Sequence, residues 1–181
     1  MKNAVKAIVF MLVGFAATAQ AQQKIGYLNA QAVLADMTDM KAADSQLEAY
    51  AKALTNKDSL MVIAFQAKAQ AFQESVQKGV VAPIEQEKQK KALEEEQAKI
   101  QQYEQEMQQQ MAAKRKDLYQ PLLDKVNKAI ADVAKEQAFT YVVDVTSGSL
   151  LYADEKNDLQ NAVRQKLGLP ALSKPTPVGG K

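Results

Sequence analysis

The sequence Gln77-Lys78-Gly79-Val80-Val81-Ala82-Pro83 interrupts a long stretch, from Gln31 to Gln137, that otherwise consists mostly of strong helix formers. Glycine often ends a helix, and proline fits the first turn of the next one. Gly79 and Pro83 therefore predict a tight turn between two helices. We expect residues 31–137 to form a helical hairpin with its tip near residues 79–83.

Apolar residues in the first half of this stretch recur at the spacing of a coiled-coil seam, which has two apolar positions in each seven residues. Asp44 and Asp58 interrupt one column, and residues 85–110 in the second half are mostly Gln, Glu and Lys. We therefore expect a narrow, discontinuous seam. Its apolar members are Val33, Met40, Leu47, Leu54 and Met61 in one column and Met37, Ala51, Phe65 and Phe72 in the other.

The predicted hairpin is too long for a compact protein. Two helices of about 50 residues, rising roughly 1.5 Å per residue, would extend on the order of 75 Å. The chain of 181 residues has only 6% aromatic residues and no Trp, which argues against one large globular core. An extended or oligomeric protein is expected, and its function has to account for the reach of the arm.

The first 21 residues have the features of a secretory signal peptide. Lys2 and Lys6 precede a largely apolar run over residues 7–17, and Ala19-Gln20-Ala21 fits the cleavage rule for small residues. The alternative is a membrane anchor, but the apolar run is too short to cross about 30 Å of hydrocarbon. The sequence predicts export, with cleavage near Ala21.

The composition of the exported chain limits its partners. There is no Cys for a disulfide or a lipid anchor, so a soluble protein is expected. The full chain has 23 basic and 21 acidic residues, and removal of Lys2 and Lys6 would leave 21 of each. A neutral chain has no general electrostatic attraction for nucleic acid or anionic lipid, so we expect no nucleic-acid partner.

Short β-prone segments lie at both ends of the hairpin. Residues 24–29 precede it, with Asn29 suited to cap the next helix, and residues 139–145 and 150–152 follow it around a turn that contains Gly148. Because a lone strand is unstable, these segments should meet in one small sheet. The predicted fold class is α+β, mostly α, with a helical-hairpin (coiled-coil) arm on a small β-sheet base.

The base should consist of residues 22–30 and 138–169, together with the apolar end of the second helix at residues 118–137. A last short helix is expected to carry Leu159, Val163 and Leu167 and to end at Gly168. Residues 170–181 are rich in Pro and Gly, and we expect this tail to be disordered.

In order and spacing, these segments resemble the Skp/OmpH family of periplasmic chaperones. The resemblance rests on KIGYLN at residues 24–29, LYQPLLDKVNKAI at 118–130, VAKE at 133–136, YVVD at 141–144 and LYAD at 151–154. It implies a homotrimer whose strands form a small β-barrel and whose three arms surround a cavity. It also implies that the cavity holds unfolded outer-membrane β-barrel proteins without ATP or another cofactor.

The resemblance gives two sets of candidate residues. Apolar side chains of the arm that face the cavity would bind clients, and these are Met61, Phe65, Phe72, Val76, Ile100, Tyr103 and Met107. The strands would form the trimer core through Ile25, Tyr27, Leu28, Tyr141, Val143, Val145 and Leu151. The alternative for the arm residues is ordinary packing in the seam. Some relatives bind lipopolysaccharide, but the neutral chain with mixed charges near its tip does not support that site here.

Little in the sequence supports catalysis. There is no His, no Cys and no Gly-rich phosphate loop, so we predict that the protein is not an enzyme and needs no metal or cofactor. The favoured function is an ATP-independent holdase chaperone. The competing hypothesis is a structural coiled-coil scaffold or spacer of the cell envelope, which would be expected to have a continuous, well-filled seam.

Overall fold

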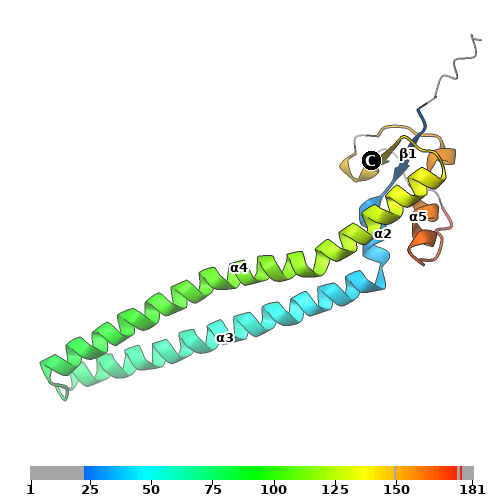
Figure 1. The fold of residues 1–181 in the computed structure, drawn as a ribbon. Coiled ribbons are helices and arrows are strands. Elements are labelled where there is room, and N and C mark those ends of the chain that lie inside the picture. Colours follow the sequence, from blue (N-terminus) through cyan, green and yellow to red (C-terminus); the bar gives the residue numbers. More distant parts are fainter. Residues whose placement is uncertain (1–22, 149, 175, 177–181) are drawn as a thin grey trace, which may run out of the picture.

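The computed structural model describes residues 23–148, 150–174 and 176, so the predicted signal peptide at residues 1–21 lies outside the described residues. Figure 1 shows a long two-helix arm that projects from a small base. The prediction of a mostly helical fold with a small sheet is confirmed. Its elements are β1 (Ile25–Leu28), α2 (Ala30–Asp36), α3 (Thr38–Gln77), α4 (Pro83–Glu136), β2 (Tyr141–Asp144), the 3-10 turns η1 (Val145–Ser147) and η2 (Glu155–Asn157), and α5 (Gln160–Lys166).

The arm is formed by α3 and α4, which lie side by side along its length (Figure 1). With 40 residues in α3, the arm reaches about 60 Å from its junction with the base. At the tip, Gly79 has a φ of 64°, a left-handed conformation that suits glycine, and Pro83 is the first residue of α4. The predicted hairpin and its turn are therefore present.

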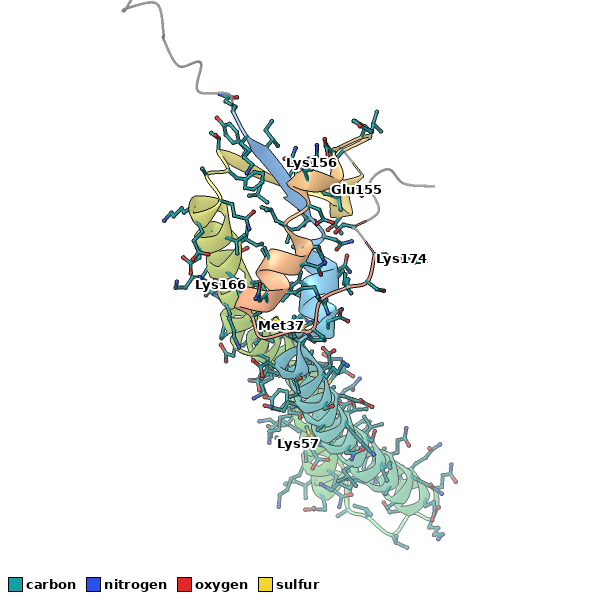
Figure 2. All side chains as sticks on the ribbon, turned by 90° about the vertical axis from the view of Figure 1, so that its right-hand side faces the viewer. Met37, Lys57, Glu155, Lys156, Lys166 and Lys174 are labelled. Carbon is teal, nitrogen blue, oxygen red and sulfur yellow. The ribbon has the colours of Figure 1, made fainter. Side chains whose placement is uncertain are left out.

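A break at Met37 separates the arm from the base. The backbone of Met37 is extended, with φ −70° and ψ 131°, and its N–H donates to the Leu34 carbonyl at 3.0 Å to close α2. Its side chain is 3% exposed and lies at the junction of the two parts (Figure 2). The heptad spacing predicted one continuous helix through this residue. It is instead two helices, because Met37 packs into the core of the base and not into the seam.

The two strands form a parallel pair in which Ile25 lies opposite Tyr141 and Leu28 opposite Asp144. A parallel pair requires a long connection between its strands, and here the whole arm is that connection. The prediction that segments from both ends of the hairpin meet in one sheet is confirmed.

The strand expected at residues 150–152 is absent from the structure, and this prediction was wrong. Leu151 and Tyr152 are each 84% exposed. The reason lies just after β2, where the carboxylate of Asp144 accepts a hydrogen bond from the Thr146 N–H at 3.0 Å and starts η1. The chain therefore enters a 3-10 turn instead of the short β-turn that would pair it back onto β2.

The folding core lies in the base, where α2, the C-terminal end of α4 and α5 pack against one another and α4 also contacts β2. Gly26 allows this close packing, because a Cβ there would lie only 2.8 Å from Leu159 Cδ1. The predicted apolar stripe at the end of the second helix supplies much of the core. The central buried residues of the core are Leu28, Val33, Val126, Val133, Leu159 and Val163.

The chain after α5 returns to pack on the base. Arg164 is 3% exposed, forms an ion pair with Asp36, and donates from Nε to the Pro170 carbonyl at 2.7 Å. Thr176 donates from its N–H to Asp158 at 2.7 Å. The sequence analysis expected disorder over residues 170–181, whereas residues 170–172 and Thr176 make these specific contacts with the base. The partners of this segment lie on and next to α5, and a prediction from composition alone does not detect them.

Candidate functional site: the apolar surface of the arm

The seam between α3 and α4 is well filled only in the half of the arm nearer the base. Leu47, Leu54 and Tyr103 are buried there, each at most 9% exposed. From residue 55 to residue 102, along both helices and around the tip, no residue is buried. We call residues 55–102 the distal arm. Its apolar side chains therefore remain accessible to solvent or to a partner.

We distinguish three grooves between α3 and α4 in the described part of the chain. The tip groove has a volume of about 400 Å³ and is lined by Lys68, Ala71, Phe72, Ser75, Val81, Gln89, Ala92, Leu93 and Glu96. The middle groove has about 220 Å³ and is lined by Met61, Ala64, Phe65, Lys68, Glu96, Lys99 and Ile100. The proximal groove has about 320 Å³ and is lined by Ala51, Thr55, Met107, Gln108, Met111, Ala112 and Arg115.

Most of the arm residues predicted to bind clients line one of these grooves. Met61, Phe65 and Ile100 lie in the middle groove, Phe72 in the tip groove and Met107 in the proximal groove. All five are partly exposed. Their binding role stays a prediction, but each is placed where another chain could reach it.

Tyr103 has a different place from the one predicted. It is 6% exposed, and its hydroxyl donates to the Leu54 carbonyl at 3.4 Å. The Lys57 ammonium lies 4.5 Å from the centre of its ring, a cation–π contact. Tyr103 therefore packs in the seam and holds the two helices together. It is therefore not one of the arm residues whose side chain a client could reach.

Leu60 and Ile63 are exposed apolar residues of α3 that were not among the predicted client-binding residues, because the heptad spacing does not select them. They are 67% and 61% exposed, so they point away from α4. The signal was present in the sequence, because residues 60–65 are six consecutive apolar residues. A helix with that composition is apolar all the way round, and a two-helix seam can cover only one side of it.

The turn at the tip is also apolar. Val80 is 73% exposed and Ile84 is 84% exposed, while Val76, which was predicted to bind clients, is 37% exposed and lines none of the three grooves. The distal arm thus combines partly covered grooves with fully accessible apolar side chains.

Polar contacts join α3 and α4 at intervals along the arm. The Tyr119 hydroxyl donates to Asp44 at 2.7 Å, and this hydrogen bond raises the pKa of Tyr119. Farther out, Lys68 and Glu96 form an ion pair across the two helices. Asp58 differs from these residues, because its Oδ1 is buried and has no hydrogen-bond partner. We call the Tyr119–Asp44 and Lys68–Glu96 contacts the polar clasps of the arm.

The residues predicted for a trimer core divide into two groups. Tyr27 and Leu28 are 2% and 1% exposed, so they are already buried within the single chain. The others lie at or near its surface. Ile25, Tyr141 and Leu151 are 46%, 55% and 84% exposed, and Val143 and Val145 are half-buried.

The two edges of the sheet differ. A bridge between Tyr27 and Asp158 lies on the β1 side, whereas β2 pairs only with β1 among the described residues. An uncovered strand edge with exposed apolar neighbours is a site at which another chain can add.

These features define a class of protein, namely a long coiled-coil arm carried on a small α+β base. Within this class, the chain belongs to the OmpH-like family of outer membrane proteins, whose sequence profile matches residues 24–167. A crystal structure from Caulobacter crescentus, described as a candidate outer membrane chaperone of the OmpH-like type, has a similar fold. The TM-score is 0.68 at 17% identity, over 84% of this chain and 89% of that one. No curated protein sequence matches the chain.

Proposed function

We propose that this protein is an ATP-independent holdase chaperone that binds unfolded outer-membrane β-barrel proteins and prevents their aggregation. Its family, and the description of the Caulobacter protein with the same fold, support a chaperone role. The observation that carries the proposal is the distal arm. No residue there is buried, and the large apolar side chains of Leu60, Ile63, Val80 and Ile84 are between 61% and 84% exposed.

An accessible apolar surface of this kind suits an unfolded client. An unfolded chain presents its apolar residues in no fixed register, so scattered and adaptable contacts capture it better than one shaped pocket. Such contacts form and break without any chemical step. The proposed activity therefore needs neither a nucleotide nor a cofactor, and it assigns no catalytic residue.

We further propose that the protein acts as a homotrimer. The uncovered edge of β2, which includes the exposed Tyr141, and the exposed Leu151 and Tyr152 in the segment that follows it support pairing between copies at the base. Three arms joined at one base would raise each other's effective concentration around a client. Weak individual contacts could then sum to tight binding while the client stays unfolded.

The proposed place of action is the periplasm, reached through cleavage of the signal peptide at residues 1–21. The structure describes no helix, within the ranges it covers, that is long and apolar enough to cross a membrane. The predicted neutral charge of the exported chain gives no reason to propose nucleic acid or lipopolysaccharide as a partner.

The second candidate function is a structural scaffold or spacer of the cell envelope. The filled seam around Leu47, Leu54 and Tyr103 favours it, because a stiff arm needs such packing. The distal arm argues against the spacer hypothesis, because a spacer has no use for exposed apolar side chains such as Leu60 and Ile63 on its outer surface. A large exposed apolar surface on a protein that binds no unfolded chain would itself promote aggregation.

A refolding assay tests the proposal. A denatured outer-membrane β-barrel protein is diluted from urea with and without the full exported chain, and light scattering reports aggregation. We expect strong suppression without ATP. The double variant Leu60→Ser/Ile63→Ser should be clearly weaker, because it removes two accessible apolar contacts. Leu123→Ser, which changes a 40% exposed leucine near the base, serves as the matched control and should retain full activity.

Unchanged aggregation in the presence of the wild-type chain would favour the spacer hypothesis. Equal loss of activity in Leu60→Ser/Ile63→Ser and Leu123→Ser would show that the distal arm has no special role. Circular dichroism of both variants confirms that the helices are intact before activities are compared.

A further inference from the structure

The tip groove and the middle groove form one continuous feature. Lys68 and Glu96 line both of them, so the two grooves meet at the ion pair between these residues and lie on one flank of the arm. Along α3 the combined feature extends from Met61 to Ser75, which is about 21 Å at roughly 1.5 Å per residue. We call it the bipartite groove.

Most of the polar groups that line the bipartite groove already have a partner within the chain. The Ser75 hydroxyl donates to the Phe72 carbonyl at 2.7 Å, and the Gln89 amide donates to Glu85 at 3.3 Å. Lys68 and Glu96 form an ion pair with each other, whereas Lys99 in the middle groove is exposed. The remaining lining is largely apolar, so the groove mainly offers contacts to apolar side chains.

The length and division of the groove fit an extended peptide. An extended strand rises about 3.3 Å per residue, so roughly six residues span the groove, and alternate side chains project to the same face. Volumes of about 400 Å³ and 220 Å³ on either side of the ion pair can accept those side chains. The side chains in between would face solvent.

The charges at the middle of the groove also favour an extended backbone. The Lys68 side chain is 60% exposed and that of Glu96 is 32% exposed, so both keep hydrogen-bonding capacity toward a ligand that crosses them. An extended peptide carries free N–H and C=O groups there, which complement a carboxylate and an ammonium. A bound helix would not, because its backbone groups bond to one another.

We propose that the bipartite groove binds an extended polypeptide segment of about six residues whose alternate side chains are apolar. This inference rests on the proposed holdase function and gives it a defined subsite within a single arm. A segment that forms a strand in the folded β-barrel has the required alternation of apolar residues along its sequence, because successive side chains of a strand face opposite sides. The rest of the distal arm would then hold the client by less ordered contacts.

Thiol protection tests this site, because the chain contains no Cys and a single introduced thiol is labelled alone. Ala71→Cys places a thiol in the tip groove and Ala64→Cys places one in the middle groove. Ala67→Cys is the matched control, since Ala67 is exposed on α3 and lines neither groove. Each variant of the full exported chain is treated with a maleimide dye in the presence of a synthetic peptide.

The probe peptide alternates Val and Thr over eight residues, and the reference peptide contains the same residues as a Val block followed by a Thr block. We expect the alternating peptide to slow labelling of Ala71→Cys and Ala64→Cys at least about fivefold, because a covered thiol reacts slowly. Labelling of Ala67→Cys should not change. The block peptide should protect neither groove position to the same extent.

Equal protection at all three positions, or equal protection by both peptides, would overturn the proposal in favour of non-specific apolar contact. Absence of protection at both groove positions would also overturn it. The aggregation assay separates this result from the proposed function. A chain that suppresses aggregation without groove protection keeps the holdase function and loses the subsite, whereas protection without suppression refutes the holdase function alone.

Discussion

Asp44 and Asp58 occupy the same column of the seam, but the structure gives them opposite environments. Asp44 accepts a hydrogen bond from the Tyr119 hydroxyl at 2.7 Å, whereas Asp58 Oδ1 is buried without a partner. Each is replaced by alanine in turn, so that the same atoms are removed from the same kind of position. We expect Asp58→Ala to stabilise the arm and Asp44→Ala not to do so.

The expected magnitude follows from three contributions. Leaving a buried polar group without a partner costs about 1–3 kcal/mol, and Asp58→Ala removes that cost. Replacing Asp by Ala inside a helix contributes roughly a further 0.5 kcal/mol at either position. Asp44→Ala also loses a hydrogen bond worth about 1 kcal/mol at a partly solvated site. The helix-propensity contribution cancels between the two variants, so they should differ by roughly 2–4 kcal/mol in free energy of unfolding, with Asp58→Ala the more stable.

Urea unfolding followed by far-UV circular dichroism measures this difference. All chains are compared at one protein concentration, because an oligomer changes its apparent stability with concentration. Hydrogen exchange then shows whether the gain of Asp58→Ala lies in residues 55–102, as expected. If Asp58→Ala were no more stable than the wild type, or if the two variants unfolded together, the buried oxygen would not be a cost to the arm and the reasoning would be refuted.

Three further predictions concern the base, the distal arm and pH. Val143→Asp should dissociate the proposed trimer, which sedimentation velocity would show as a shift to monomer, and a wild-type monomer at micromolar concentration would contradict the trimer itself. Amides of residues 85–110 should exchange much faster than those of residues 126–145, because the former contribute a single buried side chain, and uniform protection would argue against a mobile arm. Partial burial acts to raise the pKa of Asp144, but hydrogen bonds from Thr146 and Ala30 outweigh it and hold the pKa below 3.8. The stability that Asp144 contributes should be fully present above pH 3.8 and lost below it, so the difference in unfolding midpoint between wild type and Asp144→Asn should shrink in acid.

The sequence was sufficient for the features that local rules determine. Gly79 and Pro83 predicted the turn at the tip, and Asn29 was expected to cap a helix. Its side chain accepts a hydrogen bond from the Ala32 N–H at 2.8 Å. Each of these predictions depends on one residue and its nearest neighbours along the chain.

Features that depend on distant contacts were predicted less well. The break at Met37 requires knowing that this side chain enters the core of the base, and heptad spacing contains no such information. The packing of residues 170–174 depends on Arg164 and Asn161 in α5. The set of candidate client-binding residues was incomplete for a different reason. Heptad spacing favours positions in or near the seam, whereas Leu60 and Ile63 are accessible because they lie outside it.

The proposed holdase function places two opposing requirements on the distal arm. Apolar side chains that pack fully against each other would stabilise the hairpin but would leave nothing for a client, and a hairpin without cross-contacts would not hold its helices in register. The Lys68–Glu96 clasp contributes little to stability, since an exposed ion pair is worth about 0–1 kcal/mol, but it joins α3 to α4 within the distal arm. It does so without covering apolar surface. Polar contacts of this kind link the two helices while Phe65 and Phe72 stay partly exposed, so that cross-contacts and an accessible apolar surface occur together on one arm.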